Sequence, residues 1–401
     1  MEETVLRRKK ELPFIVCILF LLGVTVMSGC DMKGVQKKVT DYWEEQSSEY
    51  TAFKKELTAG TILEKTLYVE SISENKYAYR QLDEETKQVY DEILHAILNH
   101  MDKITVATLD PEKLKSAFCH VSADYGGLFW ISGYSYTEYT RNGELVSIEF
   151  APKYTMSYEE RKEMQEKVDE EVERFLSGIS PGDSDYAKAK YVFENLIREV
   201  DYDKDAPNSQ NIVSVFCDKR TVCQGYASAT MYLLNQLNIP GVIVTGSANG
   251  EAHAWNLVNL DGAYYYMDTT WGNSTYLDED SRESKFINYA YLAFTTEEME
   301  ETHVPDGQLA LPQCEEMKDN YFVQEGLYFE EWLPDEIGDI YGQAQNNEDG
   351  RASVKFATNE LYEKAKNYFI DQQRLEDYCE VTGNVYYLGE PSSKVLTISI
   401  K

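Results

Sequence analysis

Three residues whose side chains can carry nucleophilic chemistry fall in one stretch, 221–272. Cys223 stands at the expected start of a helix, and His253 and Asp268 lie on two expected strands. A thiol becomes a nucleophile when an imidazole takes its proton, and a carboxylate can hold that imidazole in the required tautomer and orientation. The set therefore predicts a thiol nucleophile with its base and its orienting group.

The residues around Cys223 have the pattern of a helix start. Thr221 can cap the helix, Pro240-Gly241 can stop it, and the apolar positions between them recur at helical spacing, namely Ala227, Met231, Leu234 and Leu237. Cys223 then falls in the first turn, where unpaired backbone N–H groups and the helix dipole favour a thiolate. Gly225 is expected to leave room for a substrate to approach closely.

The pair Asp261-Gly262 predicts a two-residue hairpin turn, because it separates two runs of strand-forming residues. If Leu260 pairs with Ala263, His253 and Asp268 become diagonal neighbours on one face of the hairpin. Such neighbours have α-carbons about 7–8 Å apart, within reach for a carboxylate and an imidazole nitrogen. The other ring nitrogen is then left to take the proton from the cysteine.

At these residues the sequence resembles the transglutaminase-like superfamily. Its three motifs stand here as Cys223-Gln224-Gly225-Tyr226, His253-Ala254-Trp255-Asn256 and Asp268-Thr269-Thr270-Trp271. The resemblance is specific over about 191–272, and weaker similarity extends to secreted bacterial proteins of this type. It implies a papain-like α+β fold, in which a helix bearing the cysteine packs on an antiparallel sheet. It also implies Cys223 as nucleophile, His253 as general base and acid, and Asp268 as the residue that orients His253.

Other residues are candidates for binding the acyl group. One oxyanion donor is expected to be the backbone N–H of Cys223, and Gln210, in the loop before the helix, is the candidate for a second. Gln224 is its rival by proximity, and a solvated loop role for Gln210 stays open. Three aromatic residues are candidates for the cleft wall, although core packing explains the two tryptophans equally well: Tyr226, Trp255 and Trp271.

Charge and composition exclude some classes of function. The chain has 401 residues, a net charge of −32 and 43% hydrophobic residues, which describes a folded and strongly acidic protein. Nucleic-acid binding needs a basic face, so that role is not expected. We expect neither a metal nor an organic cofactor, and the oligomeric state stays open.

The N-terminus has the order of a secretory signal peptide. A basic run at 7–10 precedes an apolar run at 14–26, which is short of the roughly 20 residues that a spanning helix needs. Met27-Ser28-Gly29-Cys30 then resembles a bacterial lipobox, although Met27 replaces the commoner leucine. We therefore predict that Cys30 is lipidated and that the mature protein is tethered outside the cytoplasmic membrane. A plain membrane anchor is the alternative.

Helical and strand periodicity predicts four helices and one hairpin. Helices are predicted over 81–100, 158–177 and 184–200, and Asn-Gly at 142–143 predicts a hairpin within 128–154. A short helix is expected over 297–303. The proposed segments are a signal peptide (1–29), a tether (30–61), an N-terminal helix and hairpin region (62–155), the catalytic core (156–305) and a small C-terminal α+β lobe (306–401).

Three other patterns give no site. Asp201, Asp203 and Asp205 alternate as in a calcium loop, but the later positions of that loop do not match. The remaining histidines have no evident partners. Four cysteines outside the motifs are expected to be buried free thiols, with one disulfide among them left open: Cys119, Cys217, Cys314 and Cys379.

The sequence thus predicts an extracytoplasmic cysteine hydrolase that forms a thioester at Cys223 from a peptide, isopeptide or glutamine carboxamide. Hydrolysis is favoured over amine transfer because no lysine-binding tunnel is marked in the sequence. A protein-crosslinking transglutaminase is the first alternative. A non-catalytic module that binds cell-envelope peptides is the second.

Overall fold

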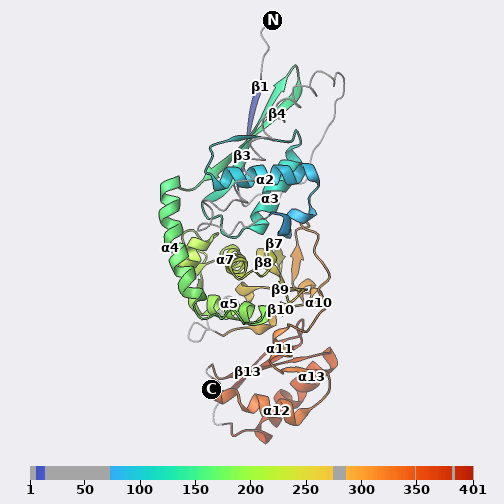
Figure 1. Cartoon of the computed structure of the whole chain (residues 1–401). Coiled ribbons are helices and arrows are strands. Elements are labelled where there is room, and N and C mark those ends of the chain that lie inside the picture. The colour runs from blue at the N-terminus through green and yellow to red at the C-terminus, as the bar shows by residue number, and fades with distance from the viewer. Residues whose placement is uncertain (1–5, 14–72, 274–285, 348, 382–383, 401) are drawn as a thin grey trace.

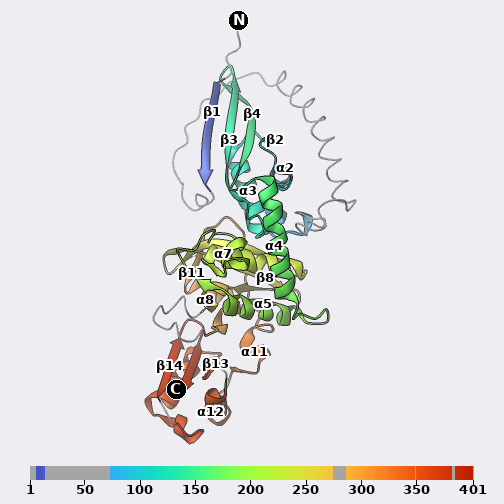
Figure 2. The same ribbon diagram turned by 90° about the vertical axis from the view of Figure 1, so that its left-hand side faces the viewer.

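The computed structural model describes residues 6–13, 73–273, 286–347, 349–381 and 384–400. Cys30, the apolar run at 14–26 and the tether at 30–61 lie outside these ranges. Three parts follow one another along the length of the molecule, with the N-terminal part at one end and the C-terminal lobe at the other (Figures 1 and 2). In the described residues no helix is long and apolar enough to cross a membrane.

The N-terminal part packs two helices against a sheet. The helices are α2 (Glu84–Leu98) and α3 (Pro111–Asp124), and short 3-10 helices precede them at η2 (Ser73–Asn75) and η3 (Tyr79–Gln81). The sheet order is β1-β3-β4-β2, with β1 at Leu6–Pro13, β2 at Ile104–Val106, β3 at Ile131–Arg141 and β4 at Glu144–Tyr154. The hairpin expected at Asn142-Gly143 is confirmed, and both turn residues have positive φ. The basic run at 7–10 lies in β1, which pairs antiparallel with β3.

Two of the predicted helices flank the core, as α4 (Tyr158–Leu176) and α5 (Asp185–Glu199). Ser157 and Glu160 form a reciprocal capping box that fixes the start of α4. A short helix and a two-stranded parallel ladder lead to the next helix; they are α6 (Ile212–Phe216), β5 (Asp201–Tyr202) and β6 (Arg220–Thr221). Helix α7 (Cys223–Gln236) then runs through the centre of the molecule, and its residues from Gly225 to Leu234 are buried.

The core sheet has the order β10-β9-β8-β7-β11 and is antiparallel throughout. Its strands are β7 (Gly241–Ala248), β8 (Glu251–Leu260), β9 (Ala263–Met267), β10 (Leu292–Phe294) and β11 (His303–Pro305). In the described parts of the connections lie three short helices: α8 (Thr269–Gly272), η4 (Tyr289–Tyr291) and α10 (Thr296–Glu300). The expected helix over 297–303 is therefore wrong at its end, because the chain leaves α10 and pairs as an edge strand with β7.

The C-terminal lobe has a hydrophobic cluster of its own, made from residues between Phe329 and Ile400. Its elements are β12 (Tyr328–Phe329), α12 (Pro334–Gly342), η5 (Ala344–Asn346), β13 (Arg351–Phe356), α13 (Asn359–Lys366), η6 (Asn367–Asp371), η7 (Arg374–Asp377), β14 (Val385–Glu390) and β15 (Val395–Ile400). Helix α13 continues directly into the π-helical turn η6, and β14 and β15 form an antiparallel hairpin. Segment 309–328, with α11 (Tyr321–Gln324), packs instead against the larger cluster shared by the core and the N-terminal part. The molecule is α+β, and a helix that begins at Cys223 packs on an antiparallel sheet, as predicted.

Candidate active site

Cys223 is the first residue of α7 and is partly exposed. The helix begins after Val222, which makes no side-chain cap, so the expected cap by Thr221 is wrong. Thr221 instead donates from Oγ1 to the carbonyl of Ser209 (2.9 Å) and accepts from the Ser214 hydroxyl (2.7 Å). These bonds tie β6 to the preceding loop and thereby fix where α7 begins. The thiol therefore lies at a helix N-terminus, where a negative charge is favoured.

Gly225 has a packing role rather than the expected role in substrate approach. A β-carbon built at this position would lie 1.8 Å from Thr221 Oγ1 and 2.9 Å from the Ser209 carbonyl. Real β-carbon contacts do not reach such distances, so only glycine lets the first turn of α7 lie against this loop. The absent side chain thus helps to hold Cys223 in place.

The hairpin of β8 and β9 has the predicted register. Leu260 pairs with Ala263 and Asn256 pairs with Met267, but β9 ends there, earlier than expected. Asp268 instead caps α8, and its Oδ1 accepts hydrogen bonds from the backbone N–H groups at 270 (2.9 Å) and 271 (3.0 Å). Its Oδ2 lies 2.7 Å from His253 Nε2. The predicted contact is present, although the carboxylate comes from a helix cap and not from a strand.

His253 and Asp268 each stabilise the charged form of the other. Burial alone would lower the pKa of His253, but the Asp268 carboxylate and hydrogen bonding with Asp268 and Cys223 outweigh burial and raise that pKa to about 10. Burial acts in the opposite sense on Asp268, and its histidine neighbours outweigh burial and lower the carboxyl pKa well below its usual range. The ionised carboxylate therefore favours an imidazolium at His253.

A second histidine, His303 of β11, contacts the same carboxylate. Its Nε2 lies 3.0 Å from Asp268 Oδ2, and its Nδ1 lies 2.7 Å from Thr302 Oγ1. The side chains of His303 and Asp268 are fully buried. The sequence prediction missed His303 because it treated the other histidines as having no partners. The one local signal was Val304-Pro305, since proline within a strand marks an edge strand.

The aromatic candidates for the cleft wall are interior residues. Tyr226 is fully buried, donates to the carbonyl of Val200 (2.7 Å) and accepts from Asn273 (2.9 Å). Trp255 and Trp271 lie with ring centroids 4.9 and 4.8 Å from that of His303. Both tryptophans are buried and enclose the histidine and aspartate cluster. They keep water away from the His253–Asp268 contact, which strengthens it.

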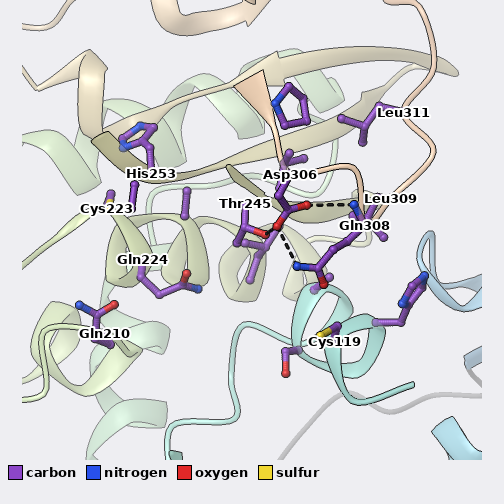
Figure 3. Close-up of a pocket in the computed structure, with 18 of the residues that line it drawn as sticks. Cys119, Gln210, Cys223, Gln224, Thr245, His253, Asp306, Gln308, Leu309 and Leu311 are labelled. Atoms are coloured by element: carbon purple, nitrogen blue, oxygen red, sulfur yellow. Dashed lines mark hydrogen bonds between the residues drawn. The ribbon is translucent and has the colours of Figure 1, made fainter. Parts of the chain in front are cut away.

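A cavity of about 230 Å³ lies in front of Cys223 and His253. Gln210 and Gln224 line it at the same end as the cysteine (Figure 3). Gln224 donates to Ser228 of its own helix (3.2 Å), which leaves Gln210 as the better placed amide. Helix α3 supplies one wall through residues 118–123, and the segment after β11 supplies another. The N-terminal part thus covers one side of the cleft.

Metal-binding residue types meet at this site. Among the described residues, His253, Asp268 and His303 are close enough to bind one ion. However, Nε2 of His253 and Nε2 of His303 both lie at hydrogen-bond distance from Oδ2 of Asp268, so an ion would have to displace these hydrogen bonds. Of the calcium-like aspartates, Asp203 accepts a hydrogen bond from Arg220 (3.0 Å).

The five cysteines in the described residues form no disulfide with one another, so none joins the four outside the motifs. The expectation that those four are buried is wrong for Cys217, which is exposed, and for Cys119 and Cys379, which are partly exposed. Only Cys314 of the four is buried. Cys119 lies on α3 and lines the same cavity as Cys223.

Comparison with known proteins points to the same part of the chain. A sequence model of the transglutaminase-like superfamily matches residues 173–269. Kyphoscoliosis peptidase of Mus musculus is 22% identical over 142 residues, which cover 31% of this chain and 22% of the peptidase. The chain thus spans about a fifth of the length of that relative.

Solved structures give partial matches. One described as a TGase has 16% identity and a TM-score of 0.26, and the match covers 35% of this chain and 44% of that one. A putative cysteine protease from Cytophaga hutchinsonii has 15% identity and a TM-score of 0.23, over 34% and 57% of the two chains. The match of the family model ends at Thr269, beside Asp268, so it contains Cys223, His253 and Asp268. The chain carries a transglutaminase-like domain.

Proposed function

We propose that this protein is a cysteine hydrolase that cleaves a peptide, isopeptide or side-chain amide bond through a thioester on Cys223. The observation that carries the proposal is that a thiol and an imidazole line one cavity, with a carboxylate buried behind the imidazole. The thiol lies at a helix N-terminus, the imidazole lies beside it, and the carboxylate lies 2.7 Å from that imidazole. This arrangement supports the proposal, because nucleophilic catalysis needs a base beside the nucleophile and a group that orients the base.

In the first half of the reaction, His253 takes the thiol proton and the Cys223 thiolate attacks the carbonyl carbon. The carbon–sulfur bond forms as the carbonyl oxygen takes up the negative charge. The backbone N–H of Cys223 and the side-chain amide of Gln210 are the proposed donors to that oxygen. His253 then gives its proton to the leaving nitrogen, the carbon–nitrogen bond breaks, and an amine and a thioester result.

In the second half, water replaces the amine. His253 accepts a proton from water as the water oxygen attacks the thioester carbon. The carbon–sulfur bond then breaks, which releases a carboxylic acid and the Cys223 thiolate. Asp268 holds the ring in one orientation through both halves, because its Oδ2 contacts Nε2 and leaves Nδ1 for the proton exchanged with Cys223. Atoms and charge balance with water as the only co-substrate.

A primary amine in place of water would make the protein a crosslinking transglutaminase. We favour hydrolysis because the sequence marks no tunnel that would align a lysine and exclude water. Labelled alkylamine and a glutamine-containing protein distinguish the two. Incorporation of the label would favour the transferase, whereas ammonia or new amino termini without incorporation would favour the hydrolase.

Alkylation tests the catalytic claim without knowledge of the substrate. At about pH 6 an ordinary thiol is protonated and slow to react, whereas a thiolate paired with an imidazolium reacts quickly. We expect iodoacetamide to label Cys223 first in the intact protein, and the rate to fall in His253→Ala. Peptide mapping by mass spectrometry measures both.

Two other thiols are internal controls. Cys119 lines the same cavity, and Cys217 is exposed, although burial of its sulfur raises its pKa. Labelling of Cys223 at the rate of Cys217, or an unchanged rate in His253→Ala, would refute the thiolate–imidazole pair. The protein would then be better described as a non-catalytic module that binds envelope peptides in this cavity.

The proposed location is the outer face of the cytoplasmic membrane, with a lipid tether at Cys30. The support is the order of basic run, apolar run and lipobox-like ending in the sequence. Cys30→Ala should release the protein from the detergent-soluble membrane fraction. Retention of this variant in the membrane would rule out the lipid tether.

A further inference from the structure

His303 lies outside the matched family segment 173–269 and has no assigned role, yet it contacts the orienting carboxylate directly. We propose that His303 is a positioning residue, which holds Asp268 in place and limits how strongly this carboxylate retains the proton on His253. The proposal rests on the proposed thiol chemistry. It adds a fourth side chain, carried by the edge strand β11, to the cysteine, histidine and aspartate.

The hydrogen-bond partners determine the tautomers of both rings. An ionised carboxylate can only accept hydrogen bonds, so Nε2 of His253 and Nε2 of His303 must each carry a proton. A neutral His303 then accepts at Nδ1, and the hydroxyl of Thr302 is the donor at 2.7 Å. A neutral His253 likewise has its lone pair on Nδ1, the nitrogen that must take the proton from Cys223.

His303 and His253 share one carboxylate oxygen of Asp268, so His303 changes how strongly that oxygen attracts the proton on His253. Both imidazoles donate to Asp268 Oδ2, at 2.7 and 3.0 Å, while Oδ1 is held by two backbone N–H groups. Each donor withdraws charge from the carboxylate. His303 therefore weakens the hold of Asp268 on the His253 proton, which His253 must release to the leaving nitrogen.

Among the residues that the structure describes, few other ionisable groups near this cluster could produce the same effect. Cys223 from α7 lies on the His253 side, and Tyr291 from η4 interacts with Asp268 and is itself held neutral because burial raises its pKa. In the described part of the chain, the His303 ring also contacts three aromatic rings: Trp255 from β8, Trp271 from α8 and Phe294 from β10. His303 is thus the neighbour through which the charge on Asp268 is adjusted.

Two variants separate hydrogen bonding from packing. His303→Phe keeps an aromatic ring among the tryptophans but removes both hydrogen bonds, whereas His303→Gln keeps a donor for Asp268 and loses the ring. If His303 acts through hydrogen bonds, Cys223 in His303→Phe should be alkylated at about pH 6 at least as fast as in the wild type, because a proton held more firmly on His253 favours the thiolate, and His303→Gln should match the wild type. A role in packing alone predicts a slower rate in His303→Gln, which lacks the ring, and an unchanged rate in His303→Phe.

The second readout is the pKa of the His253 imidazolium, followed by NMR in the full chain labelled with ¹⁵N-histidine. The signal is assigned through His253→Gln. We expect this pKa to rise by about one unit in His303→Phe and to change little in His303→Gln. An unchanged value in both variants, with both folded by circular dichroism, would overturn the proposal.

Two further outcomes are distinguishable. If Cys223 is not activated even in the wild type, the proposed function fails, and the NMR result still decides whether His303 adjusts His253. If a chelator lowers the wild-type alkylation rate and Zn²⁺ restores it, the cluster is a metal site, and the positioning role is refuted.

Discussion

At the scale of single residues, the site depends on the carboxylate of Asp268. It accepts four hydrogen bonds, from two histidine rings and two backbone N–H groups, and is completely buried. A buried charge is tolerated only when its oxygens are satisfied in this way. Its ionised state is thus a result of the fold, and it determines which nitrogen of His253 is turned toward Cys223.

Asp268→Asn should slow the alkylation of Cys223 about 10- to 100-fold, since a hydrogen bond to a charged group contributes about 1.5–3 kcal/mol. An amide at this position can also offer an N–H to Nε2, which selects the wrong tautomer of His253. The rate at about pH 6 measures the effect. A wild-type rate in a folded Asp268→Asn protein would show that the carboxylate does not orient His253.

The same substitution should change how stability depends on pH. The pKa of His253 is raised from 6.5 to about 10, so its ion pair stabilises the fold fully below pH 6.5, and this stabilisation is lost as pH rises through about 10. The pKa of Asp268 is lowered from 3.8, so its contribution is present above pH 3.8 and is lost only in stronger acid. The wild type should therefore exceed Asp268→Asn in free energy of unfolding most clearly between these limits. Urea titrations across pH test this, and a constant difference up to pH 10 and beyond would contradict it.

At the scale of elements, α7 and the hairpin of β8 and β9 are fastened to each other. Asn256 of β8 donates to the carbonyl of Ala227 in α7 (3.0 Å), and the hydroxyls of Thr230 and Thr269 are 2.9 Å apart. These buried bonds join the helix that carries the thiol to the segment that carries the carboxylate. Small shifts at the start of α7 should therefore alter the reactivity of Cys223.

Gly225→Ala should disturb that start directly. The added methyl group meets Thr221 and Ser209, and the strain is expected to cost about 1–3 kcal/mol of stability. Alkylation of Cys223 should slow at the same time. Gly182→Ala is the matched control, because a β-carbon there meets nothing within 4 Å. Equal stability of the two variants in urea would mean that the loop yields to the methyl group.

Local sequence patterns predicted most of these elements, and the turn at Asp261-Gly262 shows why they could. A two-residue turn fixes the register of its own hairpin, so the contact of His253 with Asp268 followed from neighbouring residues. β11 has no such signal. It pairs with β7 across several intervening elements, and no turn links the two strands. His303 was therefore not predicted, and neither was the packing of Gly225 against the loop that precedes α7.

At the scale of the whole molecule, the C-terminal lobe is attached to the core by a buried ion pair. Lys355 of β13 contacts Glu298 of α10 and donates to the carbonyl of Ser393 (2.8 Å). Both charged side chains are almost fully buried. Helix α10 leads directly into β11, so this attachment lies beside the segment that brings His303 to the site.

Lys355→Met should cost about 3–5 kcal/mol of stability, because Glu298 is then left as an unpaired buried charge. The double variant Lys355→Met/Glu298→Met should recover most of that loss. Lys394→Met is the control, since Lys394 pairs with an exposed Glu297 and such pairs contribute up to about 1 kcal/mol. Urea unfolding compares them, and a double variant as unstable as the single one would indicate lost packing and not an unpaired charge.

The position of β11 at the edge of the core sheet also has a consequence for the timing of folding. Cys223, His253 and Asp268 are synthesised well before residues 303–305, and the sheet is complete only when β11 pairs with β7. An edge strand that comes from later in the chain adds after the strands formed by local hairpins. If the thiol needs the complete cluster, the growing chain carries an unreactive cysteine. The thiol then becomes reactive only once the edge strand of the core sheet is in place.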